Sequence, residues 1–72
     1  MNKKNKIKIV VNGKLLTVNL KFSLKKLIEK LKTPINKVAI ELNEEIVDKK
    51  KLNKIFLKNK DKIEIVHFIG GG

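Results

Sequence analysis

Hydrophobic and polar residues alternate along the first part of the chain with the period of two that is typical of β-strands. Ile7, Ile9 and Val11 alternate with Lys6, Lys8 and Val10, and a similar alternation returns after a turn. Asn12 and Gly13 separate the two runs. An Asn-Gly pair in this place is a strong hairpin signal, because a type I′ turn needs positive φ at both central positions. We therefore predict a β-hairpin over residues 6–21.

The spacing of the hydrophobic residues then changes to that of a helix. The residues at positions i, i+3, i+4 and i+7 of one helical face are Leu24, Leu27, Ile28 and Leu31. Ser23 is a suitable N-cap, because its hydroxyl can accept an otherwise unpaired backbone N–H. Thr33-Pro34 ends the pattern, since the residue before a proline is disfavoured in the α region. The sequence predicts one amphipathic helix over residues 24–32.

The second half of the chain predicts further strands separated by polar segments. Residues 38–42 have the pattern of a third strand, and residues 46–47 can form only a short fourth one. A polar loop over 48–51 leads to an irregular or single-turn helical segment, 52–57, that packs on the core. The last strand, 63–68, is nearly continuously apolar, which favours a central place between the first and third strands with both faces buried. One main helix and a mixed sheet of four to five strands make an α+β domain.

The residue inventory argues against an enzyme. The 72 residues suffice for one domain with a small core, in which we expect Phe22 and Phe56. The chain has no Cys, Trp or Tyr and a single His, so it offers no disulfide framework, cysteine nucleophile or ready metal cage. No apolar run reaches the ~20 residues of a membrane span, and the basic start lacks the apolar block of a signal peptide. We expect a cytoplasmic protein that does not enter a membrane.

The net charge of +11 could attract nucleic acid, an anionic surface or an acidic protein, but a solvated surface is the preferred interpretation. All 18 basic residues are Lys. Arg supplies the planar fork that reads guanine and phosphate, and aromatic residues stack on bases. Because Arg, Tyr and Trp are absent, no nucleic-acid partner is expected. The run Lys49-Lys50-Lys51 is interpreted as a solvated loop, with an acidic partner surface as the alternative.

Three consecutive glycines, Gly70, Gly71 and Gly72, end a sequence that has only one other Gly. From the residues alone, a frayed end and a functional tail both remain open. Glycine suits a substrate tail because it has no Cβ and can enter a narrow channel in another protein. A carboxylate is a poor electrophile until its oxygen becomes a good leaving group. Adenylation achieves this, and a sulfur nucleophile can then displace AMP.

The chain resembles the ThiS family, the sulfur carrier proteins of thiamine biosynthesis. The segments that carry the resemblance cover nearly the whole chain and are residues 9–14 (IVVNGK), 23–27 (SLKKL), 38–43 (VAIELN), 46–47 (IV) and 61–72 (DKIEIVHFIGGG). The resemblance implies the ubiquitin-like β-grasp fold. It divides the chain into a β-grasp domain, 1–69, and a flexible glycine tail, 70–72.

The resemblance also implies a reaction and its partners. An E1-like adenylyltransferase adenylates Gly72, a sulfur donor such as a cysteine desulfurase converts it to a thiocarboxylate, and a thiazole synthase takes the sulfur into the thiazole ring. The chain is then a protein co-substrate and is expected to be a monomer on its own. It binds no cofactor, since ATP and Mg²⁺ are used by the activating partner.

Three residues before the glycines are candidate partner contacts. Phe68 and Ile69 could anchor the tail in an apolar groove of a partner, because aromatic side chains dominate interface energetics. Core packing of Phe68 is the alternative interpretation. His67 could be a pH-sensitive contact, but an ordinary strand residue is the preferred interpretation.

Two positions depart from the family pattern. Asp48-Lys49 stands where relatives often have Pro-Arg or similar, and Lys60-Asp61 stands where many have Gly-Asp. Lys60 is therefore expected to need a positive φ, which costs roughly 1 kcal/mol for a residue other than glycine.

Other functions remain open at this stage. The same tail chemistry would serve a small subunit of molybdopterin synthase or a carrier for tRNA thiolation. A ubiquitin-like modifier conjugated to lysines, or a basic β-grasp module that binds RNA, would use the same fold differently.

Overall fold

The first two strands form the hairpin that the alternation predicts. The structure, a computed structural model, describes residues 5–68. β1 (Lys6–Val11) and β2 (Lys14–Asn19) pair antiparallel along their whole length. Asn12 has a φ of 49° and Gly13 a φ of 82°, as a type I′ turn requires.

Helix α1 (Leu24–Lys30) begins where the capping residue predicts. The Ser23 hydroxyl accepts a hydrogen bond from the Lys26 N–H at 3.1 Å. The helix buries its Leu24, Leu27 and Ile28 side chains against the sheet.

The predicted end of the helix, at residue 32, is wrong by two residues. Lys32 adopts a left-handed φ of 55° directly after the C-cap, Leu31. The Lys32 N–H donates to the Glu29 carbonyl and the Thr33 N–H to the Ile28 carbonyl, which together form a Schellman motif. Leu31 consequently turns away from the core and is 39% exposed.

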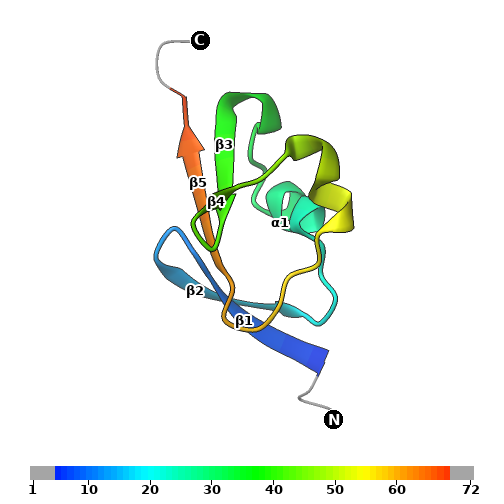
Figure 1. Cartoon of the computed structure of the whole chain (residues 1–72). Coiled ribbons are helices and arrows are strands. Elements are labelled where there is room, and N and C mark those ends of the chain that lie inside the picture. Colours follow the sequence, from blue (N-terminus) through cyan, green and yellow to red (C-terminus); the bar gives the residue numbers. More distant parts are fainter. Residues whose placement is uncertain (1–4, 69–72) are drawn as a thin grey trace.

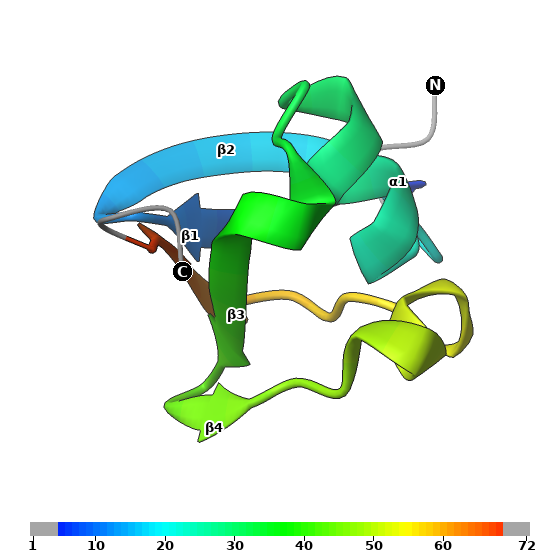
Figure 2. The same ribbon diagram turned by 90° about the horizontal axis from the view of Figure 1, so that it is seen from above.

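The last strand lies in the middle of the sheet, as the sequence predicts. The five strands follow the order β2-β1-β5-β3-β4, with β3 at Val38–Leu42, β4 at Glu45–Ile46 and β5 at Lys62–His67. β5 runs parallel to β1 and antiparallel to β3. Helix α1 lies on one side of this mixed sheet (Figures 1 and 2), so the predicted α+β class is confirmed.

Two short 3-10 helices complete the covered side of the sheet. η2 (Ile35–Lys37) precedes β3, and η3 (Lys49–Lys54) follows β4. The sequence predicts a loop over 48–51, but Asp48 accepts the Lys50 N–H at 2.9 Å and caps η3 there. The fourth strand is also shifted by one residue from the predicted 46–47.

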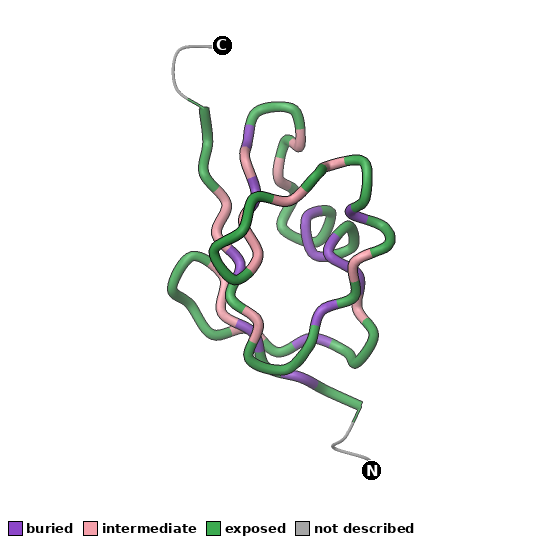
Figure 3. The backbone as a smooth tube through the Cα atoms, in the orientation of Figure 1, coloured by how far each residue is buried: buried purple, intermediate pink, exposed green. Residues whose placement is uncertain are grey.

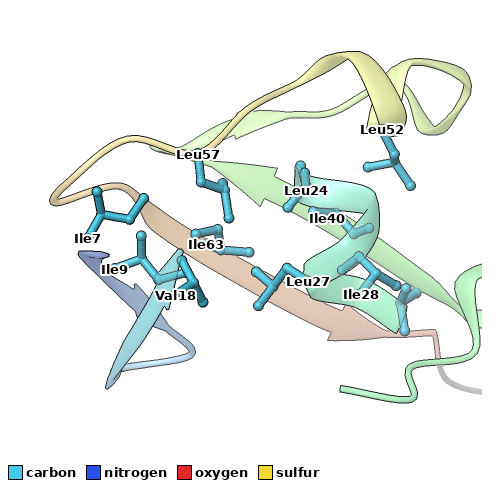
Figure 4. Close-up of a cluster of buried hydrophobic side chains, with 11 residues drawn as sticks. Ile7, Ile9, Val18, Leu24, Leu27, Ile28, Ile40, Leu52, Leu57 and Ile63 are labelled. Atoms are coloured by element: carbon cyan, nitrogen blue, oxygen red, sulfur yellow. The ribbon is translucent and has the colours of Figure 1, made fainter. Parts of the chain in front are cut away.

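The core lies between α1, η3 and the inner face of the sheet. Figure 3 shows the buried positions gathered on the elements that face one another, and Figure 4 shows their side chains meeting there. The buried hydrophobic residues are Ile7, Ile9, Val18, Leu24, Leu27, Ile28, Val38, Ile40, Leu52, Leu57 and Ile63.

The two expected core phenylalanines behave differently. Phe22 is half-buried and packs against the core, whereas Phe56 is 55% exposed, so the prediction for Phe56 is wrong. The backbone of Phe56 forms a β-bridge with Ser23. Successive side chains of an extended segment point to opposite sides. Because Leu57 is buried, Phe56 points outward.

The expectation that both faces of β5 are buried is also wrong. Ile63 is fully buried, Ile65 is half-buried, and Val66 and His67 are exposed. The helices cover only one face of the sheet. The C-terminal end of β5 extends away from them (Figure 1).

Candidate functional site

The end of β5 delivers the last residues of the chain to one end of the sheet. His67 pairs with Val38, at the start of β3. The Phe68 N–H then donates to the Lys37 carbonyl at 2.9 Å, so the pairing continues one residue past β5. Of the predicted site residues, His67 and Phe68 are described, whereas Ile69, Gly70, Gly71 and Gly72 lie outside the described residues. We call Phe68, the last described residue before the glycines, the root of the tail. Backbone pairing with Lys37 therefore holds this root in place.

Phe68 does not belong to the buried core. Its surface is 53% exposed, and its ring lies 5.3 Å from the Lys49 ammonium, measured to the ring centroid. His67 is exposed beside it. Both side chains are accessible to another protein, and their partner-binding role stays a prediction.

Lys49 is a residue whose position the sequence does not reveal. It belongs to the lysine run, but its side chain is half-buried and its Nζ donates to the Ile35 carbonyl at 2.9 Å. The contacts of Lys49 join η3 to η2 and to the end of β5, which are distant in sequence. No local pattern could have indicated them.

The outer face of the sheet carries exposed apolar residues, and one of them, Val66, lies beside the root of the tail. Side chains alternate between the two faces of a strand. Since Ile9, Ile40 and Ile63 point into the core, their strand neighbours point outward. On this outer face the register places Val66 opposite Ala39, and Leu15 opposite Val10.

These outer-face residues are open to another molecule. Val66 is 52% exposed, Leu15 67% and Ile46 70%. Glu41 and Glu64 lie opposite each other on the same face, at its centre. Exposed apolar residues gathered on one face are typical of protein interaction sites, and the two glutamates add a negative charge that a partner would have to match. This outer face suits docking.

The groups needed for catalysis do not converge in the part of the chain that the structure describes. A depression of about 430 Å³ lies between α1 and η3, and Glu29 is the single acidic residue among those that line it. Within residues 5–68, no three His, Asp or Glu side chains gather as a metal site would require. None of the helices in this range is long and apolar enough to cross a membrane.

A model of the ThiS family matches residues 9–72, a range that includes the three final glycines. Among solved structures, the thiamine biosynthesis protein ThiS from Geobacter metallireducens has a TM-score of 0.80 to this fold at 30% identity. That comparison covers 92% of this chain and 100% of the other, and it confirms the predicted ubiquitin-like β-grasp fold.

Two curated relatives match different lengths of this chain. Over 66 residues, 92% of this chain, the sequence is 38% identical to a thiazole synthase from Paramagnetospirillum magneticum. Over 35 residues, 49% of this chain, it is 50% identical to the sulfur carrier protein ThiS from Bacillus subtilis. The matched parts are 20% and 53% of those two proteins, so the chain spans about half of their length or less.

Proposed function

This chain belongs to the ThiS family, and from that premise we propose that it is a sulfur carrier whose reacting group is the Gly72 carboxylate. The observation that carries the proposal is the family match over residues 9–72, which runs from the first strand through the last glycine. A match to the folded part alone would leave the glycines unexplained.

The proposed reaction has two steps at Gly72. A Gly72 carboxylate oxygen attacks the α-phosphorus of ATP, pyrophosphate leaves, and a mixed anhydride with AMP forms. A thiol reduces the persulfide of the sulfur donor, is itself oxidised to a disulfide and releases hydrosulfide. The hydrosulfide then attacks the carbonyl carbon and AMP leaves, which gives the thiocarboxylate and releases one proton. The carrier provides the electrophile, and an E1-like adenylyltransferase provides the nucleotide pocket and Mg²⁺.

Glycine at the reacting end serves this chemistry directly. The carbonyl carbon of Gly72 has no neighbouring Cβ to obstruct the sulfur nucleophile, and Gly70 and Gly71 can adopt conformations closed to other residues. Gly72 is the fourth residue after Phe68, so the reacting carbon lies at most about 14 Å beyond Phe68. A partner must therefore dock close to the end of β5 to reach it.

The described surface around the end of β5 offers such a docking site. Val66 on the outer face supplies exposed apolar area there, and Phe68 adds an accessible aromatic ring. A partner that covers this outer face would bring its active site toward the tail.

We place the sulfur transfer in thiamine biosynthesis, with a thiazole synthase as the acceptor and a cysteine desulfurase as the donor. The support for the acceptor is the relative named thiazole synthase, in which a segment similar to nearly the whole of this chain makes up 20% of a longer protein. A carrier within the same chain as its acceptor is expected where the two act together.

Carrier-dependent exchange between ATP and labelled pyrophosphate tests the adenylation step. With the cognate E1-like enzyme, we expect label to enter ATP when the full chain is present. The variant that lacks Gly72 is the matched control and should abolish the exchange. Exchange that survives deletion of Gly72 would contradict the proposal.

A further inference from the structure

Three contacts meet at the root of the tail, and two of them come from one lysine. The Lys49 Nζ donates to the Ile35 carbonyl at 2.9 Å and lies 5.3 Å from the centroid of the Phe68 ring. The Phe68 N–H donates to the Lys37 carbonyl at 2.9 Å. Ile35 and Lys37 are the two ends of η2, so η2, Lys49 and Phe68 form a closed set of contacts.

The backbone before Lys49 fixes where its side chain starts. Lys49 is the first residue of η3, and Asp48 caps that helix through its side chain. The side chain of Lys49 is half-buried, whereas those of Lys50 and Lys51 are exposed. Its hydrogen bond to Ile35 is partly buried too. Lys49 is thus a fixed side chain within a run of solvated ones.

We propose that Lys49 is a positioning residue that holds the root of the tail through the Phe68 ring. The inference rests on the proposed function, because it concerns how the tail is presented to the activating enzyme. A cation over an aromatic face is attracted by the ring quadrupole. The ammonium still has two N–H donors after bonding Ile35, so it can serve both contacts.

The benefit of this contact is a smaller loss of freedom on docking. If Phe68 is already held in the direction that docking requires, no further conformational entropy is lost there when the partner binds. If the competent population falls, the apparent affinity falls by the same factor. Exposed cation–π contacts shift an equilibrium about two- to fivefold. We expect loss of the Lys49 ammonium to raise KM by that factor and to leave kcat unchanged.

The direct test compares Lys49→Met with Lys50→Met in the adenylation assay. Both variants remove one positive charge from the same short helix. Lys49→Met should raise KM for the carrier about two- to fivefold at low and at high salt, because contacts this short are weakly screened. Lys50→Met should change KM only at low salt. Lys49→Arg retains a cation and a donor and should restore the wild-type KM. Equal KM values for Lys49→Met and wild type would overturn the proposal.

A double-mutant cycle separates positioning from direct contact with the enzyme. If Lys49 acts through Phe68, Lys49→Met should have no further effect in a Phe68→Leu background. If the increases in KM of the two single variants multiplied in the double variant, Lys49 would contact the partner independently of Phe68. That result would overturn the proposal.

Amide exchange in the free carrier keeps this inference distinct from the proposed function. Lys49→Met should speed the exchange of the Phe68 N–H about two- to fivefold, and Lys50→Met should leave it unchanged. If wild type supports no adenylation but the Phe68 exchange responds, the proposed function fails while Lys49 still holds the root. If wild type is adenylated and the exchange does not respond, the positioning role is overturned.

Discussion

The side-chain amide of Asn12 pairs with the backbone of Ile65 as though it were another strand residue. Its Oδ1 accepts from the Ile65 N–H at 2.7 Å, and its Nδ2 donates to the Ile65 carbonyl at 3.3 Å. In the backbone, β1 pairs with β5 at Val10 and Val11, and the Asn12 N–H donates to the Ile63 carbonyl at 2.9 Å. Asn12 therefore extends the pairing along the strand that leads to the tail.

Replacing Asn12 by alanine should loosen this strand. The variant loses both side-chain hydrogen bonds and places alanine at a φ of 49°, where asparagine is better tolerated. We expect a loss of about 2 kcal/mol in the free energy of unfolding. The two exposed hydrogen bonds together contribute roughly 1 kcal/mol, and the left-handed strain of alanine contributes roughly 1 kcal/mol more. Urea denaturation measures it.

Asn19→Ala is the control for that substitution. Asn19 is exposed at the end of β2 and its φ is negative, so the change should stay within about 0.5 kcal/mol. Equal losses for the two variants would contradict the role given to the Asn12 amide.

The buried centre of β1 should govern stability. Ile9 is fully buried between α1 and the sheet, so Ile9→Ala removes packing and leaves a cavity. The free energy of unfolding should fall by about 2–5 kcal/mol, which a domain of this size can barely tolerate. Leu15→Ala, at a position 67% exposed on the outer face, should change it by less than about 0.5 kcal/mol in the same denaturation experiment. A large effect at Leu15 would show that the outer face is covered in the free protein.

The outer face should matter for docking and not for folding. Val66→Lys places a charge among the exposed apolar residues next to the tail, where burial by a partner would desolvate it. We expect KM for the activating enzyme to rise about tenfold, since desolvating this charge in the interface costs on the order of 1.4 kcal/mol or more.

Leu31→Lys is the control, because it adds the same charge at an exposed residue after α1, away from the outer face. Its KM should remain within about twofold of wild type. A similar rise for both variants would attribute the effect to net charge and would remove the outer face from the docking site.

The turn before β5 carries strain that a glycine should relieve. Lys60 has a φ of 76°, which confirms the positive φ expected from the sequence. Lys60→Gly should raise the free energy of unfolding by about 0.5 kcal/mol, because the relief of 1–2 kcal/mol exceeds the entropy cost of glycine. Lys58→Gly, at a negative φ in the same turn, should lower it. Denaturant midpoints compare the stabilities of the two variants. A lower stability of Lys60→Gly than of wild type would contradict the strain assigned to Lys60.

The parts of the fold that depend on local chemistry could be predicted from the sequence. The hairpin follows from Asn12-Gly13, whose conformational preference is a property of those two residues. The start of α1 follows from Ser23, whose hydroxyl acts within its own turn. The central place of β5 is predicted from its apolar composition, although only its inner face is covered.

The parts that depend on distant contacts could not be predicted. Lys32 ends the helix in a conformation that usually marks glycine, so no residue signal announces it. Lys49 reaches Phe68 across 19 positions, and Asn12 reaches Ile65 across 53. For the candidate site, the sequence indicates the glycine tail and the residues before it. The outer-face neighbours of Val66 emerge only from the strand register.

The most direct measurement is the mass of the C-terminal peptide after incubation with ATP, sulfide and the cognate E1-like enzyme. Replacing oxygen by sulfur adds nearly the same mass as oxidation of Met1, so the gain has to be localised by fragmentation. The account predicts a gain confined to the fragment that ends at Gly72, and none in the variant that lacks Gly72. An active enzyme that leaves the C-terminal peptide unchanged would contradict the assignment of Gly72 as the sulfur-carrying residue.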